Sequence, residues 1–223
     1  MSGAGEAPAA GREPAFVHRF VPATVAGAPT LLLLHGTGGD ETDLLPLGAM
    51  LWPGAALLSP RGRVLENGMP RFFRRLAEGV LDERDLEERS AELAAFVRDS
   101  VARHGLRADS VIVVGYSNGA NIAASLLLTE PGLLAGAVLW RAMRPYAGHP
   151  TAPRPPAGAA PVPVYLGAGL HDPYSRTAES LAELLRGWGA EVALDWRDAG
   201  HGLERSDVTS AAAWLARRFP ALG

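Results

Sequence analysis

The chain has 223 residues, which allows one large domain or two small ones. Because 48% of the residues are hydrophobic and 20% are charged, we expect a sizeable core and no disorder over the full length. The balance of 21 basic against 24 acidic residues, a net charge of −3, gives no indication of nucleic acid binding. All the basic residues are arginine and there is no cysteine, which excludes lysine Schiff bases, Walker phosphate loops, thiol nucleophiles, disulfides and cysteine zinc sites.

The beginning of the chain differs in composition from the rest. Residues 1–14 are small, rich in Pro and Gly and without periodicity, which predicts a mobile tail, and residues 15–223 are expected to form one domain. The start lacks the basic and apolar regions of a signal peptide. The longest uncharged stretch, Ser110–Thr129, contains polar residues and a glycine turn, and it is interpreted as a strand, a turn and a helix, not as a membrane span. We therefore expect a soluble, cytoplasmic protein.

Short apolar runs alternate with longer amphipathic segments along the rest of the chain. Several runs are continuously apolar (LLLL, VIVV, VPVYL), which is typical of strands buried on both faces of a parallel sheet. The expected strands are Phe16–Val21, Thr30–Leu34, Ala55–Ser59, Ser110–Gly115, Gly136–Trp140, Val162–Gly167 and Glu191–Trp196. The expected helices run from about Asp82 to His104 and over Ser117–Thr129, Ser175–Trp188 and Ser206–Phe219. This alternation predicts an α/β fold with a mostly parallel central sheet and helices on both faces.

A Gly-x-Ser-x-Gly pattern carries the strongest chemical signal. The sequence Gly115-Tyr116-Ser117-Asn118-Gly119 directly follows the strand SVIVV and begins a helix. In this context the pattern is typical of a nucleophile elbow, a strained turn that exposes the serine hydroxyl above the sheet at a helix N-terminus. The alternative is a serine N-cap in an ordinary tight turn. We expect Ser117 to be a catalytic nucleophile.

A serine nucleophile needs a general base, and the base needs an acid that orients it. In the doubly wound hydrolase arrangement these groups follow in the order Ser, Asp, His, on loops at the carboxyl ends of strands. Asp172 lies in the loop GLHDP after PVPVYL, and His201 lies in the loop AGHG after EVALDW. These two residues are the expected acid and base.

Three nearby residues are weaker candidates. His171 adjoins Asp172, and adjacent side chains point apart. Asp195 lies inside a strand pattern, and Asp198 lies on the histidine's own loop. The non-catalytic alternatives are a helix-initiating Asp-Pro turn at Asp172 and a surface loop histidine at His201.

The strand TLLLL leads into the glycine-rich sequence His35-Gly36-Thr37-Gly38-Gly39. Such a turn can direct a backbone N–H at the substrate carbonyl, and we assign this oxyanion donor to Thr37 and the second donor to Asn118, the residue after the nucleophile. His35 is expected to be structural. A phosphate cradle is disfavoured because position 41 is Glu and lysine is absent.

Together, HGTGG, GYSNG, GLHDP and AGHG resemble the α/β-hydrolase superfamily, and more closely the phospholipase/carboxylesterase family of acyl-protein thioesterases and small bacterial carboxylesterases. The resemblance covers about Thr30 to Phe219. The elbow GYSNGA and the segment LSPRGRVLENGMPRFFRR look like the bacterial carboxylesterase branch. Asn118 stands where the thioesterases usually have Gln, which argues against activity on acylated proteins.

This resemblance implies a serine carboxylesterase with the triad Ser117, Asp172 and His201, and with backbone donors at Thr37 and Asn118. It implies no metal or organic cofactor, and it allows a homodimer, as is common among such carboxylesterases. The expected substrate is a small ester with a short or medium acyl chain. Two alternatives stay open: a non-catalytic small-molecule sensor on a hydrolase scaffold, and an acyltransferase or perhydrolase that uses the same triad.

The segment Arg141–Pro161 is rich in Pro, Gly and Ala and is too short for a large cap domain, so we expect an open or shallow site. Five residues that could line a substrate pocket, or simply pack in the core, are Trp52, Phe72, Phe73, Met143 and Tyr146. Four arginines could favour an anionic or polar leaving group, or form solvated surface ion pairs: Arg61, Arg63, Arg141 and Arg144.

Overall fold

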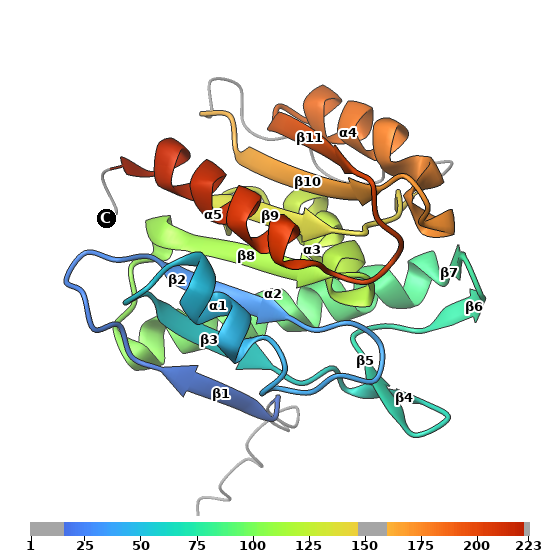
Figure 1. Ribbon diagram of the computed structural model, residues 1–223. Helices are drawn as coiled ribbons and strands as arrows, with labels where there is room; N and C mark the ends of the chain where they lie inside the picture. Colours follow the sequence, from blue (N-terminus) through green and yellow to red (C-terminus); the bar gives the residue numbers. More distant parts are fainter. Residues whose placement is uncertain (1–15, 147–159, 221–223) are drawn as a thin grey trace, which may run out of the picture.

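The computed structural model describes residues 16–146 and 160–220, and its centre is a seven-stranded sheet (Figure 1). The strand order is β1-β3-β2-β8-β9-β10-β11, in which β1 is antiparallel to β3 and all other neighbours are parallel. These strands are β1 (His18–Val21), β2 (Thr30–Leu34), β3 (Ala56–Pro60), β8 (Val111–Tyr116), β9 (Gly136–Trp140), β10 (Pro163–Gly169) and β11 (Glu191–Arg197). The predicted mostly parallel sheet is confirmed.

Helices cover both faces of the sheet (Figure 1). One face carries α1 (Leu45–Leu51) and α5 (Arg205–Arg218), and the other carries α2 (Glu83–His104), α3 (Asn118–Thr129) and α4 (Ala178–Gly187). Side chains of a strand alternate between the faces, so Leu31 and Leu33 of β2 pack on the α1/α5 side, while Leu32 and Leu34 pack on the α2/α3 side. Both faces of β2 are therefore buried, which explains its continuous run of leucines.

The observed bounds agree closely with the expected ones for β2 and β9. The helix expected over Ser175–Trp188 is divided into a short 3-10 turn, Pro173–Thr177, and α4. The described residues contain no separate cap, since β9 ends at Trp140 and β10 already begins at Pro163. The predicted tail over residues 1–14 and most of the predicted Arg141–Pro161 loop lie outside the described residues.

Two small hairpins lie beyond the carboxyl ends of the central strands (Figure 1). They are formed by β4 (Val64–Glu66) with β5 (Met69–Arg71), and by β6 (Arg75–Ala77) with β7 (Val80–Leu81). The first hairpin turns at Asn67 and Gly68, whose φ angles of 52° and 80° match the two-residue turn that Asn-Gly favours. These hairpins and α1 were not predicted from the sequence.

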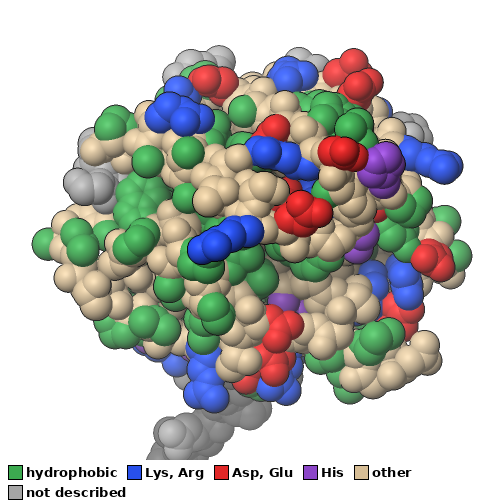
Figure 2. All heavy atoms as spheres, in the orientation of Figure 1, with side chains coloured by type: hydrophobic (Ala, Val, Ile, Leu, Met, Phe, Trp, Pro, Cys, Tyr) green, Lys and Arg blue, Asp and Glu red, His purple; other side chains and the backbone are tan. Residues whose placement is uncertain are grey.

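The face that α1 and α5 cover carries acidic and basic side chains interspersed among apolar ones (Figure 2). No single sign of charge dominates this view. Within the described residues, no helix combines the length and the apolar character needed to cross a membrane.

The close packing of α3 on β2 gives a testable prediction. A Cβ on Gly119 would lie 2.1 Å from the carbonyl oxygen of Leu34, and backbone cannot rotate away as a side chain can. We expect Gly119→Ala to lower the free energy of unfolding by about 3 kcal/mol and Tm by roughly 6–12 °C. In the control Gly187→Ala, the new Cβ meets nothing within 4 Å in α4, so thermal unfolding should show an unchanged or slightly higher Tm. Equal Tm values for both variants would contradict the contact.

Candidate active site

Ser117 occupies the sharp turn between β8 and α3. Its φ of 53° and ψ of −115° are strained for a residue with a side chain, and its N–H donates to the Trp140 carbonyl at 2.9 Å. Gly115 and Gly119 make this turn possible, because a Cβ on Gly115 would lie 2.6 Å from the Gly119 carbonyl oxygen. The strained turn between strand and helix that the Gly-x-Ser-x-Gly pattern predicted is therefore present.

The structure brings Ser117, His201 and Asp172 together from three separate loops. His201 Nε2 lies 3.0 Å from Ser117 Oγ, and His201 Nδ1 lies 3.0 Å from Asp172 Oδ2. In this network the serine hydroxyl donates to Nε2 and Nδ1–H donates to the carboxylate. The Asp172 side chain is fully buried, and it also accepts from Ser175 Oγ at 3.1 Å and from Tyr174 N–H at 3.0 Å. The acid is thus fixed on one side while it orients the imidazole on the other.

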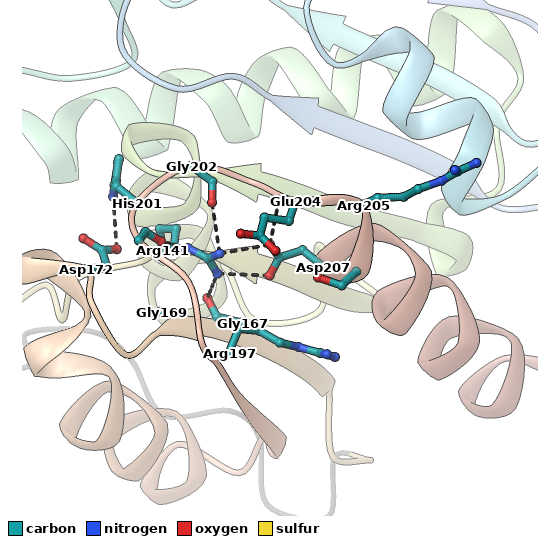
Figure 3. A network of polar contacts seen from close by, with 12 residues as sticks. Arg141, Gly167, Gly169, Asp172, Arg197, His201, Gly202, Glu204, Arg205 and Asp207 are labelled. Carbon is teal, nitrogen blue, oxygen red and sulfur yellow. Dashed lines mark hydrogen bonds and ion pairs between the residues drawn. The ribbon is translucent and has the colours of Figure 1, made fainter.

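The loop that carries His201 is held by a buried guanidinium (Figure 3). Arg141, directly after β9, is only 1% exposed and has a φ of 57°. Its Nε donates to the Gly200 carbonyl at 2.9 Å, and its Nη2 donates to the Gly202 carbonyl at 3.1 Å. Both Nη groups also bind the carboxylate of Asp207 in α5, at 3.1 and 2.9 Å. The backbone on either side of the histidine is therefore fixed by one side chain.

The other rejected or secondary candidates have partners elsewhere. His171 pairs with Asp198 at 2.7 Å, and both side chains are exposed. Asp195 accepts hydrogen bonds from Tyr165 Oη and from Arg197. Three of the four arginines considered from the sequence, Arg61, Arg63 and Arg144, do not line the site cavity. Arg61 pairs with Glu41, and Arg63 pairs with Glu92. Arg141 reaches the cavity wall, but it is a buried structural cation and not a solvated surface residue.

The two residues assigned to the oxyanion hole lie beside Ser117 in the same cavity. Within the described part of the chain, neither the Thr37 N–H nor the Asn118 N–H has a hydrogen-bond acceptor. Their side chains are held by Arg71, the last residue of β5, and by the next residue, Phe72. Arg71 Nη1 donates to Thr37 Oγ1 at 2.6 Å, and the Phe72 N–H donates to Asn118 Oδ1 at 2.7 Å. Both backbone donors are thus free to bind a substrate oxygen.

His35 holds the loop that contains Thr37. Its Nδ1–H donates to the Gly36 carbonyl at 2.6 Å, and its Nε2 accepts from the Gly62 N–H at 2.9 Å. Burial lowers the pKa of the His35 imidazole below its usual value, which favours the neutral ring that this pair of contacts requires. The structural role expected for His35 is therefore what the contacts describe.

The cavity at Ser117 has a volume of about 250 Å³. Of the residues expected to line a substrate pocket, Met143 does so. Phe72 and Phe73 do not, because their rings are packed in the hydrophobic core and are only 2% and 0% exposed. Tyr146 is also buried, with its hydroxyl 2.6 Å from Ser125 Oγ, and Trp52 lies at a different hollow.

Several lining residues were not predicted from the sequence, among them Arg71, Arg75 and Tyr174. Arg71 lies on the first hairpin, whose Asn-Gly turn was the available signal, and Arg75 lies on the second hairpin. Among the described residues, no group of three His, Asp or Glu side chains is arranged to hold a metal ion.

Known proteins similar to this chain show its family. Residues 18–216 match the family model for phospholipase/carboxylesterase, so the chain belongs to this family. The putative hydrolase MhqD of Bacillus subtilis (strain 168) is 48% identical over 186 residues, which cover 82% of this chain and 90% of the relative. The Bacillus cereus carboxylesterase structure has a TM-score of 0.86 and 43% identity, over 92% of this chain and 95% of that chain. The Mesorhizobium loti carboxylesterase structure has a TM-score of 0.84 and 34% identity, over 92% of this chain and 96% of that chain. The protein is a carboxylesterase-type serine hydrolase with an α/β-hydrolase fold.

The Arg141 contacts predict separate effects on stability and on rate. In Arg141→Met the buried Asp207 carboxylate loses its partner, and the free energy of unfolding should fall by about 3–5 kcal/mol. The double variant Arg141→Met/Asp207→Leu replaces both charges with apolar groups and should recover much of this stability. It should still show a kcat reduced roughly a hundredfold, because the Gly200 and Gly202 carbonyls are no longer held. Chemical denaturation and ester hydrolysis measure the two effects, and a double variant with normal kcat would show that Arg141 does not position His201.

Proposed function

We propose that the protein hydrolyses small carboxylic esters with short to medium acyl chains, using Ser117 as nucleophile, His201 as general base and Asp172 as the orienting acid. One observation carries the proposal. The two nitrogens of the His201 ring each lie 3.0 Å from an oxygen, Nε2 from Ser117 Oγ and Nδ1 from Asp172 Oδ2. These distances are within hydrogen-bond reach, as proton transfer from the serine requires.

The first half of the proposed reaction forms an acyl-enzyme. His201 Nε2 takes the proton from Ser117 Oγ as that oxygen attacks the ester carbonyl carbon. The negative charge that develops on the carbonyl oxygen is stabilised by the N–H groups of Thr37 and Asn118 and by the N-terminus of α3. His201 then donates the proton to the leaving alcohol oxygen as the C–O bond breaks, and Asp172 stabilises the transient imidazolium.

The second half releases the acid. His201 takes a proton from a water molecule, the hydroxide attacks the acyl carbon, and the proton returns to Ser117 Oγ as the acyl bond breaks. The cavity volume of about 250 Å³ lies below the range usual for drug-sized ligands, which supports a short or medium acyl chain.

Three further expectations from the sequence stay predictions: one domain over residues 15–223, a homodimer and a cytoplasmic location. The proposed mechanism does not depend on them, because all the groups that it uses lie in the described part of one chain.

The nucleophile and base are tested with p-nitrophenyl esters from acetate to a long-chain ester. Ser117→Ala and His201→Ala should each lower kcat by roughly a millionfold, because triad members act as a unit. The rate of the wild-type protein should fall as the acyl chain outgrows the cavity. His171→Ala removes an exposed histidine whose ring pairs with Asp198, so it is the matched control and should keep the wild-type rate.

Two outcomes would contradict this assignment. Ligand binding without turnover, unaffected by a serine-directed phosphonate, would favour the sensor alternative. Product analysis in the presence of a competing alcohol or of peroxide that gave mainly transfer product would favour acyl transfer or perhydrolysis.

The orienting acid gives an independent prediction. Asp172→Asn keeps the size of the side chain but removes the charge that stabilises the His201 imidazolium and selects its tautomer. We expect kcat to fall roughly ten-thousandfold, as in other triads. Asp198→Asn, an exposed carboxamide on the same loop as His201, should leave kcat within about twofold, which steady-state kinetics can measure. If the two variants had equal rates, Asp172 would not be the orienting acid.

A further inference from the structure

The cavity at Ser117 is lined by arginines, and the carboxylates that pair with them lie behind the lining. Three arginines, Arg71, Arg75 and Arg141, are among the described lining residues, and no Asp or Glu is among them. Arg141 is neutralised by Asp207, whose carboxylate lies 2.9 Å away. The charges of Arg71 and Arg75 are therefore the ones that a substrate meets.

Arg71 forms a buried part of the cavity wall. The residue is 4% exposed, and its Nε and Nη1 donate to the Phe73 carbonyl at 3.2 Å and to Thr37 Oγ1 at 2.6 Å. Its Nη2 has no hydrogen-bond acceptor within the described chain, and this atom is in contact with solvent. One edge of this guanidinium is thus left for a ligand, in a place where low exposure to water strengthens an ionic contact.

Arg75 adds a second cation nearer the mouth, where its side chain is 29% exposed. Its Nε and Nη2 bind Oε1 of Glu66 at 2.9 and 2.8 Å, and its Nη1 has no acceptor within the described chain. The same Glu66 lies 3.2 Å from Arg71, so one carboxylate faces two guanidinium groups. Glu78 acts weakly on Arg75, but it is exposed and bound by Tyr174 Oη. Of the three lining arginines, Arg141 thus has a carboxylate to itself, while Arg71 and Arg75 share Glu66.

We propose that the site is selective for esters that also carry a carboxylate, and that Arg71 and Arg75 bind this carboxylate. The proposal rests on the proposed esterase function and adds the substrate class. A guanidinium has planar pairs of N–H groups that match the two oxygens of a carboxylate. The small cavity limits the distance between the ester and the acid group to a short chain.

The test compares each acid with its neutral primary amide of the same shape. Monoethyl adipate against ethyl adipamate places the carboxylate on the acyl side, and 4-acetoxybutanoate against 4-acetoxybutanamide places it on the alcohol side. A pH-stat follows hydrolysis of all four esters. In at least one pair we expect kcat/KM to be about tenfold higher for the acid, mainly through KM, since a charged hydrogen bond contributes roughly this much. The pair that shows the preference identifies the side on which the carboxylate binds.

Variants connect the preference to the two arginines. Arg75→Gln and Arg71→Gln should each bring the acid-to-amide ratio close to one, and Arg75→Lys should keep part of it because the charge remains. Arg84→Gln is the matched control. It removes the same charge from α2, where the side chain is 90% exposed and pairs with Glu88, and it should leave the ratio unchanged.

The possible failures are distinguishable. If the wild-type protein hydrolyses p-nitrophenyl acetate but prefers neither acid over its amide, the carboxylate subsite is overturned and the esterase function is kept. A preference that survives both Arg71→Gln and Arg75→Gln overturns the assignment of these residues. If neither p-nitrophenyl acetate nor any of the four esters is hydrolysed, the proposed function fails and this inference fails with it.

Discussion

The ion pair between Arg141 and Asp207 is the contact on which the catalytic geometry depends, because it joins the ends of β9, β10 and β11 to the start of α5. Burying a guanidinium and a carboxylate costs several kcal/mol per ion, and the pair persists only if nearly all its hydrogen-bonding groups are satisfied. Arg141 meets this requirement with the two oxygens of Asp207 and with the carbonyls of Gly167, Gly200 and Gly202. The Gly200 and Gly202 carbonyls belong to the loop that carries His201, so the ion pair also fixes this loop.

Hydrogen bonds anchor the backbone of the His201 loop. The imidazole itself contacts the rings of Tyr116 and Tyr174. A Cβ on Gly200 or Gly202 would meet nothing within 4 Å, so the flanking glycines carry no side chain that could anchor them. Their position is set by hydrogen bonds to Arg141 and by Tyr116 Oη, which donates to the His201 carbonyl at 3.1 Å. A loop held by directional bonds at its backbone leaves the imidazole free to move protons while its distance to the serine stays fixed.

The sequence predicted those features that a local pattern determines. Continuous apolar runs predicted the central strands, and the glycines around Ser117 predicted an elbow, because each pattern reflects a steric demand within a few residues. From the sequence, Arg141 was interpreted as a solvated surface residue or as a residue that favours a polar leaving group. Its burial was not predicted, because it depends on Asp207, 66 residues further along the chain. Likewise, Phe72 was a pocket candidate and Arg71 was not, because the first hairpin was not predicted. This hairpin places Phe72 in the core and Arg71 in the cavity wall.

That hairpin explains why Asn stands after the nucleophile. The N–H of Phe72 donates to Asn118 Oδ1, Arg71 donates to Thr37 Oγ1, and the Gly38 N–H donates to the Pro70 carbonyl at 2.9 Å. One short segment therefore holds both proposed oxyanion donors in register, and a Gln side chain, longer by one methylene, would not fit the same contact without displacement. The same segment places the Arg71 guanidinium in the cavity. The proposed oxyanion donors and the proposed carboxylate subsite thus share one structural element, so a shift of this segment should change both together.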